Sequence, residues 1–221
     1  MADQQHRDWI TVPDEWTGYP LSSLVIPSHY KEDVESVLLP NGLILDRIEK
    51  LAKDIARDTE GSLTACCILK GGHQFFAADL MNRLKKRTNA AGNNMPLQLD
   101  FIKVKSYHNA ESSGTVSISY TDAELLALKG KHLLLVEDII DTGATMVALL
   151  KRLREYEPAS IRVVSLFVKR TPLSNGYIPD YCGFEIPNRF IVGYALDYNE
   201  HFRDLDHVCV ISETGKAKYA E

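Results

Sequence analysis

The chain has 221 residues, of which 45% are hydrophobic, and its formal net charge is -5. This length fits a single domain, residues 1–221, with a core of ordinary size. The acidic balance excludes a broad basic field that would attract nucleic acid, so the expected ligand is a small molecule held by a local site.

The cysteines and the N-terminus indicate the compartment. None of the four cysteines forms a Cys-x-x-Cys pair, and two of them, Cys66 and Cys67, are adjacent in an apolar run. This pattern favours reduced structural thiols over a zinc site or a disulfide framework. Residues 1–8 lack an apolar signal core, and no stretch approaches the roughly 20 apolar residues of a spanning helix. We therefore expect a cytoplasmic protein without membrane contact.

The first elements in chain order are two helices around a short strand. Apolar residues recur at helical spacing in residues 41–58 and indicate an amphipathic helix. Residues 64–69 form an apolar strand that ends in the turn Lys70-Gly71-Gly72, and a second helix follows at residues 75–84.

Alternating residues predict strands at 97–104 and 115–120. The polar segment 106–113 between them has no period and is predicted to be a loop. We expect this excursion, about residues 105–120, to serve as a flexible lid.

The clearest unit is a strand, a turn and a helix. Residues 132–136 are apolar, residues 137–145 are acidic and turn-like, and residues 146–156 are helical up to Pro158. A buried strand follows at residues 161–168. Two apolar strands joined by a helix predict a right-handed crossover in a parallel sheet, and therefore an α/β fold. Three more strands are expected, at residues 181–184, 190–195 and 208–211.

The segment 133–146 carries the expected chemistry. Its strand delivers Glu137 and Asp138 to the carboxyl edge of the sheet, where open parallel sheets bind ligands. The helix start that follows offers free backbone N–H groups, small residues and the hydroxyls of Thr142 and Thr145, which together could enclose a phosphate. A turn at Glu137 would let both acids approach the two hydroxyls of a ribose or a magnesium ion bound to them. The alternative is that Asp141 or Thr142 only caps the helix and the two acids are solvated.

The segment 133–146 resembles the signature of the type I phosphoribosyltransferase family. Further matches, in the same order along the chain, point to the branch of the family that acts on 6-oxopurines. These are residues 69–72 (LKGG), 105–107 (KSY), 168–171 (VKRT), 192–199 (VGYALDYN) and 202–205 (FRDL). The resemblance implies a central, mostly parallel sheet flanked by helices, a small hood formed by the terminal segments, and a lid loop.

The resemblance also implies how the phosphorylated sugar is held. Glu137 and Asp138 would bind the ribose hydroxyls of phosphoribosyl pyrophosphate together with Mg2+. The residues that would wrap the 5′-phosphate are Asp141, Thr142, Gly143, Ala144 and Thr145. Ala144 departs from the lysine that many relatives carry, but backbone N–H groups do most of the holding in such loops.

For the leaving group, the resemblance implies contacts from Lys70 and Gly71, whose mutual peptide bond can be cis in this family. Asp197 would bind a second magnesium ion, and Arg203 would neutralise the departing pyrophosphate. Ser106 and Tyr107 match the lid dipeptide that closes over the reacting centre. Taken without the family, Lys70-Gly71-Gly72 is an ordinary turn between a strand and a helix.

The implied base contacts select oxopurines. Lys169 would donate to the O6 oxygen, which adenine lacks. Phe190 would stack on the purine, and the backbone of Ile191 would hydrogen-bond to it. Judged alone, Lys169 is a solvent-facing lysine and residues 190–192 are a core strand.

The activity implied is transfer of the 5-phosphoribosyl group to N9 of hypoxanthine or guanine, which yields IMP or GMP and pyrophosphate. Asp141 would act as the general base toward purine N7. Assembly as a homodimer or homotetramer is implied as well.

Three rival functions remain open. One is a catalytically silent nucleotide-binding relative with a regulatory role. The second is an aspartyl-phosphate phosphatase, which would normally separate its acids by one residue, whereas two residues lie between Asp138 and Asp141. The third, a nucleic-acid-binding regulator, fits the acidic charge poorly.

Overall fold

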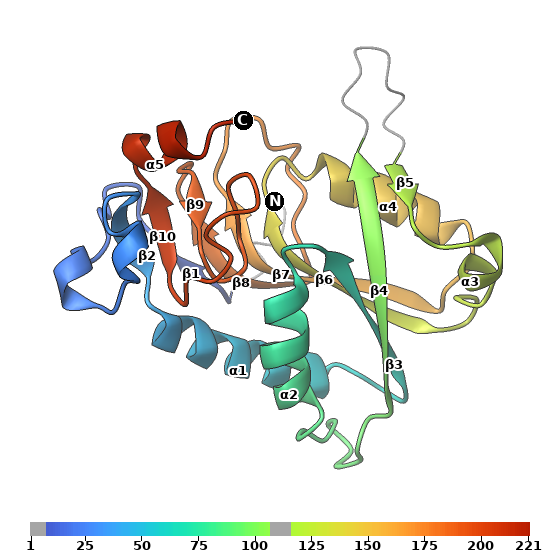
Figure 1. Cartoon of the computed structure of the whole chain (residues 1–221). Coiled ribbons are helices and arrows are strands. Elements are labelled where there is room, and N and C mark those ends of the chain that lie inside the picture. Colours follow the sequence, from blue (N-terminus) through green and yellow to red (C-terminus); the bar gives the residue numbers. More distant parts are fainter. Residues whose placement is uncertain (1–7, 107–115) are drawn as a thin grey trace, which may run out of the picture.

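A mostly parallel sheet forms the centre of the computed structural model, which describes residues 8–106 and 116–221. Its strands are β1 (Ile10–Thr11), β3 (Leu63–Leu69), β4 (Leu97–Ser106), β5 (Val116–Ile118), β6 (His132–Ile140), β7 (Ser160–Lys169) and β8 (Tyr181–Ile186). Within the described residues they lie in the order β1-β8-β7-β6-β3-β4-β5 (Figure 1). Every neighbouring pair is parallel except β4 and β5. The predicted α/β fold is confirmed.

Helices cover both faces of this sheet. They are α1 (Asn41–Arg57), a π-helical segment η3 (Gln74–Leu80) that continues into α2 (Met81–Leu84), α3 (Asp122–Leu126) and α4 (Ala144–Arg154). Leu134 and Val136 of β6 pack in the cluster that contains α1 and η3, whereas Leu133 and Leu135 pack in the cluster that contains α3 and α4. This alternation buries the strand on both sides, as parallel sheets require. No helix in the described ranges is long and apolar enough to cross a membrane.

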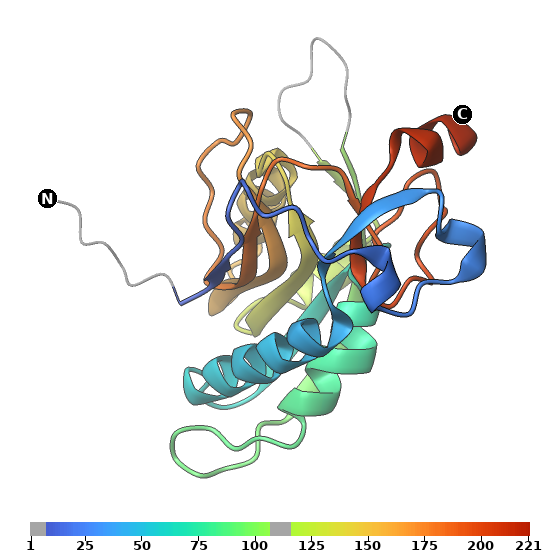
Figure 2. The same cartoon turned by 90° about the vertical axis from the view of Figure 1, so that its left-hand side faces the viewer.

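The two ends of the chain build a separate hood. It contains β2 (Val34–Leu39), β9 (Ile191–Val192), β10 (Val208–Ile211), α5 (Glu213–Lys218) and the short 3-10 helices η1 (Leu21–Ser23) and η2 (Ser28–Tyr30). Its small antiparallel sheet has the order β2-β10-β9 around a core that includes Val37, Phe202 and Cys209. Figure 2 shows the N-terminal (blue) and C-terminal (red) segments side by side in this hood. The predicted hood of terminal segments is confirmed.

Several element boundaries differ from the sequence-based predictions, and two of the differences affect the site. The strand predicted to end at Val136 continues to Ile140, because β6 keeps its pairing with β7 through Glu137 and Ser165 up to Ile140 and Val168. The strand predicted at residues 190–195 ends at Val192, since the chain then turns. The tip of the predicted lid, which includes Tyr107, lies outside the described residues.

The four cysteines are structural. All are buried, and none forms a disulfide. Burial raises the pKa of Cys66, Cys67, Cys182 and Cys209 to about 12. At neutral pH these thiols are therefore protonated, and they act as small apolar side chains in the core.

Candidate active site

The carboxyl ends of three neighbouring strands bring most of the predicted residues together. β3 ends at Leu69, β6 at Ile140 and β7 at Lys169, and the three strands are adjacent and parallel. Loops that leave such strands meet at one edge of the sheet, which is where open α/β sheets bind ligands. A cavity of about 260 Å³ lies at this edge and is lined by Glu137, both threonines of the loop 141–145, and neighbouring apolar residues.

The loop 141–145 has the shape of an anion site. Gly143 is the N-cap residue of α4, with a φ of +81°, and it has no side chain to cap the helix. A Cβ at Gly143 would lie 2.4 Å from the Asn175 side-chain oxygen, so two constraints favour glycine there. The Thr142 hydroxyl accepts from the Ala144 N–H at 3.3 Å. The first-turn N–H groups of α4 that follow have no partner within the helix and can bind a phosphate. Neither Asp141 nor Thr142 is the helix cap that the alternative interpretation required.

Glu137 and Asp138 lie inside β6, so the prediction of a turn beginning at Glu137 is wrong; the chain turns only after Ile140. Adjacent strand residues point to opposite faces. Glu137 lines the cavity on the α4 side, whereas an Asp138 carboxylate oxygen lies against Gly71, where an added Cβ would be 1.7 Å away.

Although the two acids leave the strand on opposite faces, their carboxyl groups still interact with each other. Burial and the neighbouring charge of Asp138 hold the pKa of the half-buried Glu137 well above its usual range. No side chain in the described residues forms an ion pair with either carboxylate, while the Asp138 Oδ1 atom accepts the Ile139 N–H at 2.8 Å. A bound cation would relieve this repulsion.

The turn after β3 contains a cis peptide bond between Leu69 and Lys70. The prediction that the bond between Lys70 and Gly71 can be cis is therefore wrong by one residue. The Lys70 ammonium group forms an ion pair with the Glu200 carboxylate at 2.9 Å. The hood thus supplies a partner for a residue of the central sheet.

The two residues predicted to handle the base are in contact. Lys169 is the last residue of β7, its side chain is 11% exposed, and its Nζ atom donates to Asp141 Oδ2 at 2.8 Å. Lys169 is therefore not the solvent-facing lysine that is expected when the residue is judged alone. The pair presents a hydrogen-bond donor beside an acceptor.

The hood places the other predicted residues. Phe190 is 44% exposed and packs edge to face on Tyr198 at 5.3 Å, whereas Ile191 is buried in β9. The expectation that residues 190–192 are only a core strand therefore fails for Phe190. Asp197 pairs with Arg203 at 2.9 Å, and Arg203 also donates to the Ala195 carbonyl at 2.7 Å. Ser106 ends β4, but its side chain lies outside the part that the structure describes.

Sequence reasoning missed Glu200 and Asn175. Glu200 directly follows the matched motif 192–199, but an exposed glutamate is too common to stand out in a sequence. Asn175 comes from the loop after β7, and its backbone N–H donates to the Thr142 carbonyl at 2.9 Å. No local signal identifies that contact, because it joins segments distant in sequence.

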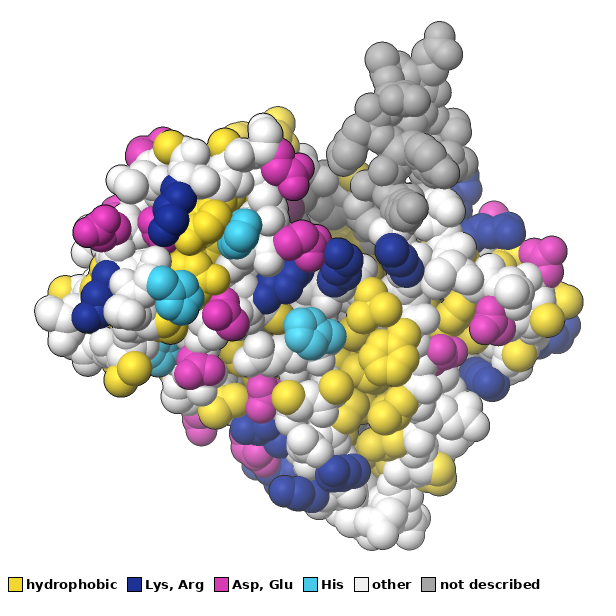
Figure 3. Space-filling model, viewed as in Figure 1, with side chains coloured by type: hydrophobic (Ala, Val, Ile, Leu, Met, Phe, Trp, Pro, Cys, Tyr) yellow, Lys and Arg dark blue, Asp and Glu magenta, His cyan; other side chains and the backbone are white. Residues whose placement is uncertain are grey.

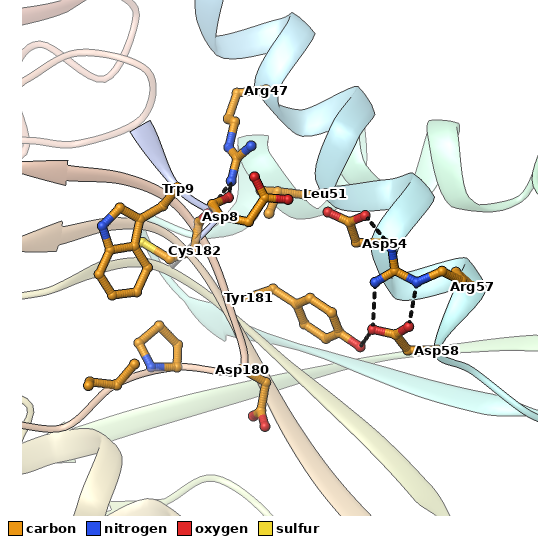
Figure 4. A pocket seen from close by; sticks show the side chains of 12 residues that line it. Asp8, Trp9, Arg47, Leu51, Asp54, Arg57, Asp58, Asp180, Tyr181 and Cys182 are labelled. Atoms are coloured by element: carbon orange, nitrogen blue, oxygen red, sulfur yellow. Dashed lines mark hydrogen bonds and ion pairs between the residues drawn. The ribbon is translucent and has the colours of Figure 1, made fainter. Parts of the chain in front are cut away.

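A larger pocket, about 470 Å³, lies where α1 ends and β8 begins, at the opposite edge of the sheet (Figure 4). Its charges are satisfied by the protein itself. The Arg47 guanidinium donates to the carbonyls of Cys182 and Gly183, and Arg57 pairs with Asp54 and Asp58. This pocket is therefore explained by the anchoring of α1 to β8, and we do not assign it a substrate.

Comparisons with known proteins agree with this geometry. Residues 36–199 match the model of the phosphoribosyl transferase domain family. The human hypoxanthine-guanine phosphoribosyltransferase is 53% identical over 211 residues, which cover 95% of this chain and 96% of that protein. The rat enzyme of the same name is 52% identical over the same length.

The similarity extends to three dimensions. A crystal structure of hypoxanthine-guanine phosphoribosyltransferase from Schistosoma mansoni in complex with IMP matches with a TM-score of 0.79 and 39% identity. The match covers 96% of this chain and all of that one. The chain belongs to the phosphoribosyltransferases and, within them, to the hypoxanthine-guanine phosphoribosyltransferase family.

The contact between Gly71 and Asp138 can be tested by substitution. In Gly71→Ala the new Cβ would force the Asp138 carboxylate or the turn to move. Displacement of about 1 Å can cost roughly 10²-fold in a positioned reaction, so we expect a loss of that order in kcat/KM for phosphoribosyl pyrophosphate. Gly42→Ala is the matched control, because nothing lies within 4 Å of its added Cβ. Equal kcat/KM values for the two variants would contradict the assignment.

Proposed function

We propose that this chain transfers the 5-phosphoribosyl group from phosphoribosyl pyrophosphate to N9 of hypoxanthine or guanine. The products are IMP or GMP and pyrophosphate, a reaction of purine salvage. The observation that supports this most directly is the 2.8 Å pair of Lys169 and Asp141 beside the loop 141–145. A 6-oxopurine offers the O6 acceptor next to the N7 position, which a donor and an acceptor at this spacing can meet. Adenine would oppose its amino group to the ammonium group of Lys169.

Different residues of the site bind the 5′-phosphate, the leaving pyrophosphate and the purine base. The loop 141–145 holds the 5′-phosphate through backbone N–H groups and hydroxyls. Lys70 and Arg203 stabilise the leaving pyrophosphate while the ribose C1 gains positive character and N9 attacks the opposite face. Asp141 exchanges a proton with purine N7, Lys169 donates to O6, and the exposed face of Phe190 stacks on the base.

We also propose Mg2+ as the cofactor. Glu137 and Asp138 would hold one ion with the ribose hydroxyls, and Asp197 would hold a second with pyrophosphate. The donor set fits, because magnesium prefers one or two carboxylates completed by phosphates and water. When bound, the metal neutralises charge on pyrophosphate.

The remaining assignments follow the chemistry of the site. We place the protein in the cytoplasm, where thiols such as the four buried cysteines stay reduced. Its partners are the small-molecule substrates, and neither nucleic acid nor membrane is expected. The single-domain organisation is part of the same proposal, as are the lid roles of Ser106 and Tyr107.

Self-association is supported by an apolar patch on β4. Leu99 is 55% exposed and Phe101 is 47% exposed, and yellow side chains gather over β4 in Figure 3. In the described residues, the backbone of β4 before Lys103 pairs only with β3, so this stretch of the other edge is open. An apolar patch at an open strand edge is typical of an interface between copies. We propose a homodimer or homotetramer.

A substrate panel tests the function. Protein, Mg2+ and phosphoribosyl pyrophosphate are mixed with hypoxanthine, guanine, xanthine or adenine, and nucleotide formation is followed. We expect turnover with hypoxanthine or guanine, roughly 10⁴-fold discrimination against adenine, and loss of activity when EDTA removes the metal. Binding of IMP without any turnover would support the catalytically silent alternative, and conversion of adenine but not hypoxanthine would refute the role of Lys169.

The proton-transfer role is tested by Asp141→Asn. The amide keeps the shape of the side chain but cannot accept the N7 proton, so kcat should fall by roughly 10²- to 10⁴-fold. KM for phosphoribosyl pyrophosphate should change little, because the Asp141 carboxylate faces Lys169. Unaltered turnover would rule out Asp141 as the base.

The assembly is tested by placing a charge in the apolar patch. Phe101→Glu should shift the mass measured by light scattering toward that of a smaller species, since a buried unpaired charge is costly at an interface. Leu173→Glu is the control, because Leu173 is 75% exposed and lies outside β4. If Phe101→Glu keeps the wild-type mass, the interface lies elsewhere.

A further inference from the structure

The two cations that the proposed function assigns to pyrophosphate already share a carboxylate. Glu200 lies between them, with Oε1 at 2.9 Å from the Lys70 ammonium and Oε2 at 3.4 Å from the Arg203 guanidinium. Lys70 follows β3 of the central sheet, whereas Arg203 belongs to the hood. One carboxylate therefore bridges two cations that belong to different parts of the fold.

The backbone holds Glu200 in this place. Asn199 and Glu200 both adopt left-handed conformations, with φ values of +48° and +66°. The Glu200 N–H donates to Asp197 Oδ2 at 2.9 Å, and the other oxygen of Asp197 pairs with Arg203 at 2.9 Å. Left-handed backbone is uncommon outside glycine, so this turn is specified by its surroundings. It aims the Glu200 carboxylate at Lys70.

The electrostatics agree with the geometry. The Glu200 carboxylate faces two cations, Lys70 and Arg203, and Asp197 pairs with the second of them. Both members of the Lys70 pair are more than half exposed. Exposed ion pairs contribute little to stability, so fold stability does not explain the arrangement.

We propose that Glu200 is a built-in counter-anion that occupies the place of pyrophosphate between Lys70 and Arg203 and must be displaced when pyrophosphate binds. The inference rests on the proposed function and adds to it a residue that tunes that subsite. Competition from Glu200 raises the apparent Kd of the pyrophosphate group by the inverse of the fraction of time that the cations are free. Because the same competition acts on the product, it also favours pyrophosphate release.

Glu200→Gln tests this with magnesium pyrophosphate as the probe. Removal of one unit charge about 4 Å from a bound anion changes its affinity about fivefold in water, so we expect pyrophosphate to bind about fivefold more tightly, as measured by calorimetry. The gain should shrink in 1 M salt, where the screening length falls to about 3 Å. It should also shrink in a Lys70→Gln background, which a purely structural role of Glu200 would not produce.

Two further variants secure the result. Glu155→Gln removes another acid that is more than half exposed, from an ion pair with Arg152 at the far end of α4, and it should leave pyrophosphate affinity unchanged. Glu200→Asn removes the charge with a residue that tolerates left-handed backbone, so it covers the case in which Glu200→Gln folds poorly.

The outcomes distinguish a failure of the inference about Glu200 from a failure of the proposed function. If the wild type binds pyrophosphate and neither Glu200 variant binds it more tightly, the inference is wrong while the proposed function stands. Weaker binding by both variants overturns it too and would make Glu200 a residue that positions Lys70. If the wild type binds no pyrophosphate and converts no base, the proposed function fails together with the inference.

Discussion

The parallel pairing of β6 with β3 and β7 is the interaction on which the site depends. The pairing with β3 reaches Val136, and the pairing with β7 runs through Glu137 to Ile140, so that the strand carries both acids to the edge before the chain turns. The same pairing brings the turn after Leu69 and the end of β7 to that edge. Since backbone ladders fix relative position to within a residue, a loss of register in β6 would separate Asp141 from Lys169. The precision of the site therefore comes from the sheet, and its chemistry comes from the loops.

Charge pairing within the site is the second organising feature. Lys169 pairs with Asp141, Lys70 with Glu200, and Arg203 with Asp197 and Glu200. Each predicted cation thus has an acidic partner in the absence of substrate, while Glu137 and Asp138 lack a basic partner among the described side chains. Glu137 and Asp138 therefore form a negatively charged position, whereas the nearby lysine and arginine side chains are already neutralised by acidic partners. A metal ion and a polyanion would complement it together better than either would alone.

Local pattern in the sequence predicted the crossover unit and the loop 141–145, and the family resemblance implied the hood. Local pattern failed where long-range contacts override local preference. Glu137 and Asp138 suggested a turn, but pairing with β7 keeps them in the strand. Phe190 suggested a buried strand, yet its ring is exposed beside Tyr198. Glu200 gave no signal at all, because its significance lies in a contact with Lys70, 130 residues away along the chain.

The two anion subsites use different physics, and this difference bears on the departure at Ala144. At the loop 141–145, neutral backbone N–H groups and hydroxyls would face the proposed 5′-phosphate, and Ala144 adds no charge where the resemblance implied lysine. At the proposed pyrophosphate subsite, side chains with full charges would do the binding, and they already carry carboxylate partners. Backbone dipoles are fixed and need no reorganisation, whereas ion pairs must exchange partners when a ligand arrives. The 5′-phosphate stays on the sugar from substrate to nucleotide, so a fixed cradle suits it. Pyrophosphate has to leave, and a subsite with its own replacement anion suits that group.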